Sequence, residues 1–113
     1  MSSTEIVGAF FEACETGKGW DGCAQYCEVN ATFSCQFEAL ADTHTLEAYA
    51  EWMKGLLGPI PDGHYELKGF AYDKENDVVL AFAVFHGTHS AAGGPIEPTG
   101  NSVAADLCVR YEF

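Results

Sequence analysis

The segment Val78–His89 restricts the possible folds most, because its first eight residues are all apolar. Such a run, rich in β-branched and aromatic side chains, is typical of a strand that is buried on both faces. Further extended segments are predicted at His64–Tyr72 and at Val103–Phe113. The polar residues Asp73–Asp77 predict a turn between the first two segments, and the glycines and prolines of Ser90–Gly100 predict a long hairpin loop before the third. Because strands this close in sequence usually pair antiparallel, we expect a sheet with the apolar run at its centre.

The residues at the start of the chain have the spacing of helices. A first helix is predicted from an N-cap at Thr4 to a stop at Gly17, because its apolar positions recur every three to four residues. A second, short helix is predicted from Asp21 or Gly22 to Cys27. These two elements together predict a helical hairpin.

A third helix and one more strand are predicted before the sheet. Thr43 or Thr45 caps the helix, an apolar stripe follows, and the turn Gly58–Gly63 ends it. Between the second and third helices, Asn30–Glu38 alternates apolar and polar residues with a period of two. This alternation predicts a half-buried strand.

These elements predict a single α+β domain over residues 1–113. Helices gathered on one face of a curved antiparallel sheet enclose a cone. A half-open cone lined by aromatic side chains is a natural pocket for a small apolar ligand. We therefore expect a ligand site between the sheet and the helices.

The charge and composition exclude several kinds of partner. Seventeen Asp and Glu against five Lys and Arg give a net charge of −12, which repels phosphate backbones and anionic lipid headgroups. No apolar run is long enough to span a bilayer, and the start of the chain lacks the features of a signal peptide. We therefore expect a cytoplasmic protein that binds neither nucleic acid nor a membrane.

The five cysteines are expected to be reduced thiols, because their number is odd and no export signal precedes them. Cys23 and Cys27 are four residues apart, but no second pair supplies the other ligands that a metal ion needs. We therefore expect these cysteines to be buried small side chains and predict no metal site.

Several short motifs are distributed over nearly the whole chain. They are Gly17–Trp20, Asn30–Ser34, Tyr49–Leu57, Phe85–His89, Gly93–Pro95 and Pro98–Gly100. In these motifs the chain resembles the nuclear-transport-factor-2-like (NTF2-like) superfamily, and within it the SnoaL-like polyketide cyclases and the related ketosteroid isomerases. The resemblance implies an NTF2-like cone with helices on the concave face of the sheet, a fold that hosts isomerases, dehydratases, cyclases, hydrolases and non-catalytic modules. It also implies one strand more than this sequence contains, so the usual final strand is expected to be missing.

The catalytic groups that the resemblance implies are replaced at the matching positions. The general-base Asp of the ketosteroid isomerases corresponds to Cys35, and their oxyanion-stabilising Tyr falls where this chain has Phe10 and Phe11. The acid/base Asp of the SnoaL-like cyclases corresponds to Val109. Asp106 lies three residues earlier and is therefore expected on the opposite, outer face of a regular strand.

His86 and His89 are the candidate catalytic residues, because imidazole suits general acid/base work near neutral pH. They are three residues apart, so in a regular strand only one of them points into the cone. The alternative is that both are hydrogen-bonded structural residues near the hairpin or an interface. His44 and His64 stand at element boundaries, where solvated turn residues are expected.

The predicted function is the binding of a small apolar carbonyl compound in the cone, with proton transfer of the cyclase, isomerase or dehydratase type and without a cofactor. The predicted pocket residues are Phe33, Cys35, Tyr49, Trp52 and Val109. The alternative is a non-catalytic module for binding a small apolar molecule or for dimerisation, which the replaced catalytic groups favour. A nucleophilic role for Cys35 has little support, because no adjacent base is evident.

The sequence also predicts contacts with a second copy of the chain. Val78–Phe85 is apolar on both sides, and a single covered face would leave a large sticky patch, so we expect a homodimer through the outer face of the sheet. The strand Val103–Phe113 has a neighbour within the sequence on one side only. Its other edge is expected to be open to pairing with another chain.

Overall fold

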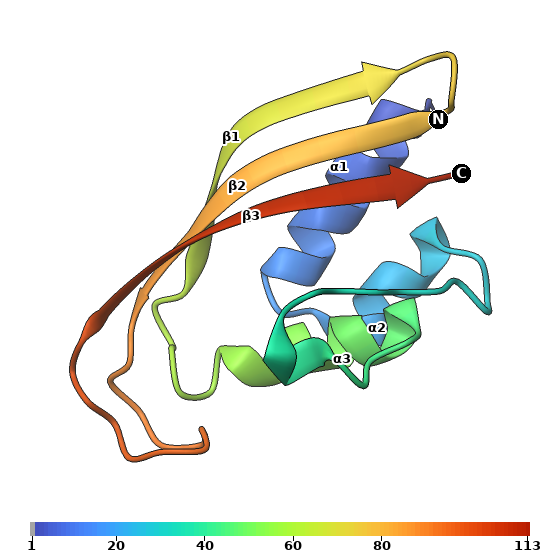
Figure 1. The fold of residues 1–113 in the computed structure, drawn as a ribbon. Helices are drawn as coiled ribbons and strands as arrows, with labels where there is room; N and C mark the ends of the chain where they lie inside the picture. Colours follow the sequence, from blue (N-terminus) through green and yellow to red (C-terminus); the bar gives the residue numbers. More distant parts are fainter. Residues whose placement is uncertain (1) are drawn as a thin grey trace.

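The computed structural model describes residues 2–113 and places helices on one face of a curved three-stranded antiparallel sheet (Figure 1). The helices are α1 (Ser3–Glu15), α2 (Gly19–Cys23) and α3 (Leu46–Leu56), and the strands are β1 (His64–Asp73), β2 (Val78–Thr88) and β3 (Ser102–Glu112). The strand order is β1-β2-β3, so the apolar strand is central. The predicted α+β class, the antiparallel pairing and the helices on the concave face are confirmed.

Local hydrogen bonds define both ends of α1. The helix begins at a capping box in which the Ser2 hydroxyl accepts from the Glu5 N–H, so the predicted cap at Thr4 is wrong by two residues. It ends where the Gly17 N–H donates to the Cys14 carbonyl at 3.1 Å. Gly17 has a φ of 77°, a left-handed conformation that favours glycine and stops the helix as predicted.

The other two helices lie near their predicted positions. α2 begins at Gly19, before the predicted start, and continues as a 3-10 turn over Ala24–Tyr26. At the start of α3 the Thr45 hydroxyl accepts a hydrogen bond from the Ala48 N–H at 3.2 Å, which confirms the second of the two predicted caps. Two of its residues, Ala50 and Met53, are buried in the core.

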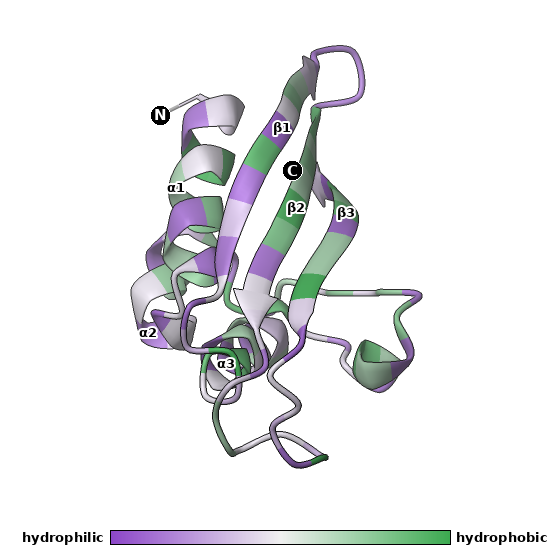
Figure 2. Cartoon of the chain, turned by 90° about the vertical axis from the view of Figure 1, so that its left-hand side faces the viewer, coloured by the Kyte–Doolittle hydropathy of each residue, from purple (hydrophilic) through white to green (hydrophobic). Residues whose placement is uncertain are grey.

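The helix-facing side of β2 forms the floor of the core. Val79, Ala81 and Ala83 are fully buried, and Phe85 is 5% exposed. The strand carries a continuous series of hydrophobic residues, flanked by more polar strands (Figure 2). α1 packs across β1 and β2 on this side, while α2 and α3 lie near one end of the sheet (Figure 1). The register of β1 shifts between Leu67 and Gly69, and an irregularity of this kind bends a strand.

The opposite, outer side of β2 is solvent-exposed in the single chain. Leu80 is 42% exposed and Phe82 is 45% exposed, which is unusual for large apolar side chains of a central strand. The predicted apolar outer face is therefore present, and no helix within residues 2–113 covers it (Figure 1).

The predicted strand Asn30–Glu38 is wrong. This segment has one isolated bridge, between Thr32 and Thr45, followed by bends and a 3-10 turn at Glu38–Leu40. Its backbone bonds go to the residues before α3, as the Phe33 N–H donates to the His44 carbonyl at 2.9 Å. A strand needs a partner along its length, and among the described residues no strand runs beside this segment.

β3 lies at the edge of the sheet and, within residues 2–113, pairs only with β2. The long hairpin loop predicted between β2 and β3 is present, and it extends beyond the end of the sheet (Figure 1). None of the helices described is long and apolar enough to cross a bilayer.

Candidate functional site

The interior between the sheet and the helices contains a buried carboxyl group. Glu15, the last residue of α1, is 5% exposed. It follows Phe11 by four residues, a spacing that places both on one face of the helix. Its Oε1 accepts from the Tyr49 hydroxyl at 3.4 Å, whereas its buried Oε2 has no hydrogen-bond partner among the described residues. Burial of a carboxyl oxygen without a hydrogen-bond partner is costly, so such a group calls for an explanation such as a ligand, a water or a catalytic role.

Three tyrosines from three different elements lie in the same interior. They are Tyr49 on α3, Tyr65 on β1 and Tyr111 on β3, and all three pack against the core. Edge-to-face contacts with α1 hold two of the rings, Tyr111 against Phe10 at 5.9 Å and Tyr65 against Phe11 at 5.8 Å between centroids. The sheet and α3 therefore supply phenol groups around the end of α1.

The surroundings raise the pKa of Glu15 and of the three tyrosines. Burial raises the pKa of Glu15 to about 7, and the nearby hydroxyls of Tyr65 and Tyr49 offset part of the rise. Burial, and then the Glu15 charge, raise the pKa of each of the three phenols. Near neutral pH the carboxyl can therefore accept or release a proton, while the tyrosines remain neutral donors.

Of the predicted pocket residues, Tyr49 is the one that contacts Glu15. Phe33 stacks on Tyr49 with ring centroids 4.4 Å apart, and Trp52 meets Phe37 edge-on at 6.4 Å, so both belong to an aromatic cover over α3. Cys35 is exposed in the irregular segment. Val109 is half-buried on the helix-facing side of β3, opposite Ala81. The predicted residues thus lie in three separate places.

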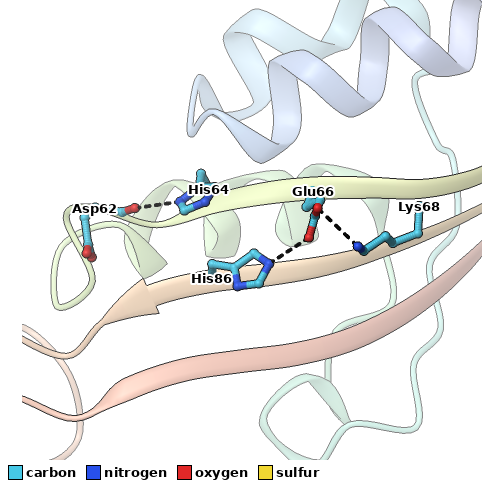
Figure 3. Close-up of polar contacts among 5 residues, drawn as sticks. All are labelled: Asp62, His64, Glu66, Lys68 and His86. Atoms are coloured by element: carbon cyan, nitrogen blue, oxygen red, sulfur yellow. Dashed lines mark hydrogen bonds and ion pairs between the residues drawn. The ribbon is translucent and has the colours of Figure 1, made fainter.

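The candidate catalytic histidines lie outside this interior cluster. His86 is on the outer face of the sheet, where its Nε2 is 3.1 Å from Glu66 Oε1 and its ring stacks on His64 at 5.4 Å (Figure 3). Hydrogen bonds from Lys68 and His86 lower the pKa of the exposed Glu66. These groups form a polar row along the edge of the sheet.

His89 follows the end of β2 and belongs to the hairpin. Its Nδ1 is 3.3 Å from the Thr99 hydroxyl, and its backbone carbonyl accepts from the Gly100 N–H at 2.8 Å. Through these bonds His89 connects the two ends of the loop. The catalytic role of His86 and His89 remains a prediction.

Two open hollows are present on the surface of the structure. One lies within the loop over residues 92–98, and the other lies between α1 and α2. Neither of these two hollows is lined by Glu15 or by the three tyrosines. Within the described part of the chain, no three His, Cys, Asp or Glu side chains are arranged to hold a metal ion.

The sequence reasoning missed Glu15. The available signal was its position four residues after Phe11 on the apolar stripe of α1, where a carboxyl group is unexpected. Asp106, by contrast, is exposed on the outer face opposite Val84, as predicted.

Comparisons with known proteins agree with this architecture. AclR from Streptomyces galilaeus, a proposed hydroxylase, is 19% identical and superposes with a TM-score of 0.74 over 98% of this chain, which spans 66% of AclR. IdmH from Streptomyces antibioticus, a proposed polyketide cyclase, is 14% identical, with a TM-score of 0.73 over 100% of this chain and 84% of IdmH. An uncharacterized cystatin-fold protein from Novosphingobium aromaticivorans is 19% identical, with a TM-score of 0.70 over 100% of this chain and 89% of its own. At these identities the likeness shows the fold alone.

No curated protein matches the sequence at a significant level. The SnoaL-like domain, however, matches residues 7–113, a range that contains most of α1 and all of α3 and the sheet. Every element that surrounds Glu15 lies within this range. The chain therefore belongs to the SnoaL-like domain family of the NTF2-like superfamily.

Proposed function

We propose that this protein binds a small, largely apolar carbonyl compound between the sheet and the helices and transfers a proton on it. The observation that carries the proposal is the unpartnered, buried Oε2 of Glu15. A carboxyl group in such a place lowers the stability of the fold unless a ligand uses it, and perturbed groups of this kind concentrate at functional sites. The reaction is of the cyclase, isomerase or dehydratase type and uses no cofactor.

The chemistry assigns different roles to the carboxyl and the phenols. The Glu15 carboxylate removes a proton from the carbon next to the carbonyl, and the electron pair of the broken C–H bond moves onto the carbonyl oxygen. Tyr49 and Tyr65 donate hydrogen bonds to the oxygen as its negative charge develops. Glu15, now protonated, returns the proton to another carbon of the substrate. Alternatively, the enolate carbon attacks a second carbonyl carbon and closes a ring, and the alkoxide that forms takes the proton from Glu15.

The similar proteins support this class of substrate. IdmH is described as a proposed polyketide cyclase. Ring closure of a polyketide joins a carbon beside one carbonyl to another carbonyl carbon, which needs the same proton transfers. The apolar and aromatic side chains around Glu15 suit a substrate with few charged groups.

A two-step experiment tests the proposal. Steroid ketones and aromatic polyketide-like ketones are screened for an increase in the melting temperature, because a ligand of the folded state stabilises it. For a ketone that binds, uptake of solvent deuterium beside the carbonyl is followed by NMR. Glu15→Gln should slow this uptake by on the order of a hundredfold, while Glu12→Gln, which changes an exposed residue of the same helix, should leave it unchanged.

Two outcomes contradict the assignment of Glu15. Equal rates for Glu15→Gln and the wild type would exclude it as the acid/base. A loss of activity in His86→Gln or His89→Gln, with Glu15→Gln fully active, would move the chemistry to the histidines.

The second candidate function is a non-catalytic module. It is favoured by the replacement of the family's catalytic groups by Cys35, Val109 and the Phe10–Phe11 pair, and neither of the two hollows described reaches Glu15. If no ketone changes the melting temperature and the interior remains closed, this function replaces the first.

We also propose that the protein forms a homodimer through the outer face of its sheet. Exposed Leu80 and Phe82 support the interface, because burial of two such side chains at its centre would remove a large apolar patch from water. At about 10 μM, sedimentation should detect a dimer, and Phe82→Lys should weaken it by about thirtyfold. The matched control is Ala92→Lys, which adds the same charge to an exposed loop. A wild-type monomer at this concentration would contradict the proposal.

A reducing compartment fits the cysteines. All five are free thiols in the structure. We therefore propose a cytoplasmic location, where thiols are kept reduced.

A further inference from the structure

We propose that β3 also pairs antiparallel with β3 of a second copy of this chain, in the register that places Cys108 opposite Cys108 and joins the two sheets edge to edge. This contact is separate from the proposed active site and uses the backbone of the edge strand. Its charged side chains lie on the outer face next to Leu80 and Phe82, so its tests are done with the outer-face interface weakened.

The free edge of β3 supplies the hydrogen-bonding groups. Eleven residues of β3, Ser102–Glu112, are paired with β2 along one side, and in residues 2–113 no strand is paired on the other. Every second residue of an antiparallel edge strand points its N–H and C=O away from the sheet. A long, regular edge of this kind is a template for strand addition.

The charges of β3 select both the partner and the register. Asp106 and Arg110 are exposed on the outer face, two residues on either side of Cys108. When two copies pair about Cys108, Asp106 of each copy lies directly opposite Arg110 of the other. The same register places Leu107 opposite Val109 on the helix-facing side. Opposite charges and apolar pairs at directly opposed positions stabilise a sheet.

The neighbouring registers lack this match. The helix-facing sides of the two sheets must lie on the same side of the joined sheet. The register can therefore change only by placing another residue of β3 on the two-fold axis. Centring on Leu107 places Asp106 opposite Cys108, so Asp106 meets no cation, and Arg110 keeps only its ion pair with Glu112 of the same strand. Centring on Val109 places Asp106 opposite Glu112, so that like charges meet. A second copy therefore fits β3 best about Cys108.

Cys108 makes the register measurable. Its thiol is exposed, and in the proposed pairing it meets its own copy on the two-fold axis. Directly opposed residues of an antiparallel pair have their Cβ atoms about 4.5–5.5 Å apart, close enough for a disulfide after a small adjustment. The other exposed cysteine, Cys35, lies in the irregular segment before α3 and serves as the control.

The first test traps the contact with an oxidant. The Phe82→Ser variant, which weakens the outer-face interface without adding a charge beside Cys108, is treated at about 200 μM with diamide in about 0.15 M salt, which screens the repulsion between acidic chains. Two thiols lose two protons and two electrons to diamide, which is reduced to its hydrazine. A disulfide dimer should form, should persist after Cys35→Ser and should be absent after Cys108→Ser. Loss of the dimer with Cys35→Ser, or no Cys108 disulfide, would overturn the proposal.

The second test measures the non-covalent contact in the same background. Asp106→Arg or Arg110→Asp should each weaken association by about tenfold, because each creates two like-charge pairs. The double exchange of both residues should restore it to within about threefold. Amides on the free edge of β3 should also gain protection from hydrogen exchange as concentration rises. Failure of the double exchange to restore association, or exchange that is independent of concentration, would overturn the proposal.

Discussion

The wild-type protein is expected to lose stability as the pH rises from 5 to 8, and Glu15→Gln is expected to abolish this pH dependence. Burial in the folded state raises the pKa of Glu15 to about 7, whereas the ordinary pKa of a glutamate carboxyl group is 4.5. Between these values the unfolded state has released the proton and the folded state retains it, so the free energy of unfolding falls as pH rises. The loss is complete above the folded pKa and amounts to about 3 kcal/mol over the whole window.

Urea denaturation at pH 5, 6, 7 and 8 measures this effect as the difference between the two proteins. Contributions from groups that the two proteins share cancel in the difference. Glu12→Gln, on the exposed side of α1, should follow the wild type. A difference curve that is flat between pH 5 and pH 8 would show that Glu15 is charged in the folded protein at all these values.

Phe10→Ala is expected to reduce the free energy of unfolding by about 3–5 kcal/mol, because it leaves a cavity at the contact between α1 and the sheet. Phe10 is 3% exposed, belongs to the core and meets the Tyr111 ring edge-on. A loss of this size is a large part of the total stability of a domain.

The matched control is Phe113→Ala, because Phe113 is 54% exposed. It should cost less than about 1 kcal/mol, as expected of a surface substitution. Chemical denaturation at a concentration of about 1 μM compares both variants with the wild type. Similar losses for the two substitutions would mean that Phe10 does not hold α1 against β3.

The strands and helices that the sequence predicted correctly are those whose signals are local. The continuous apolar run of β2 is enough to predict a central strand, although in the single chain only its helix-facing side is buried. The α3 cap at Thr45 and the α1 stop at Gly17 depend on bonds within a few residues. Such elements need little information from the rest of the chain.

The wrong prediction of a strand at Asn30–Glu38 shows that a local pattern is not sufficient to predict strand formation. Asn30–Glu38 has the alternation of a half-buried strand, yet Phe37 is 58% exposed and no strand forms. Alternation states which side chains would share a face, but a strand also needs backbone partners from elsewhere. The partner depends on the order of strands in the sheet.

The sequence by itself determined the α+β class, the central strand, the apolar outer face and the family resemblance. Only the tertiary structure revealed the candidate site, because Glu15 is joined there by tyrosines from α3, β1 and β3, far apart in the chain. Whether a carboxyl group is buried, and so whether it holds a proton near pH 7, depends on the desolvation that the surrounding elements produce together.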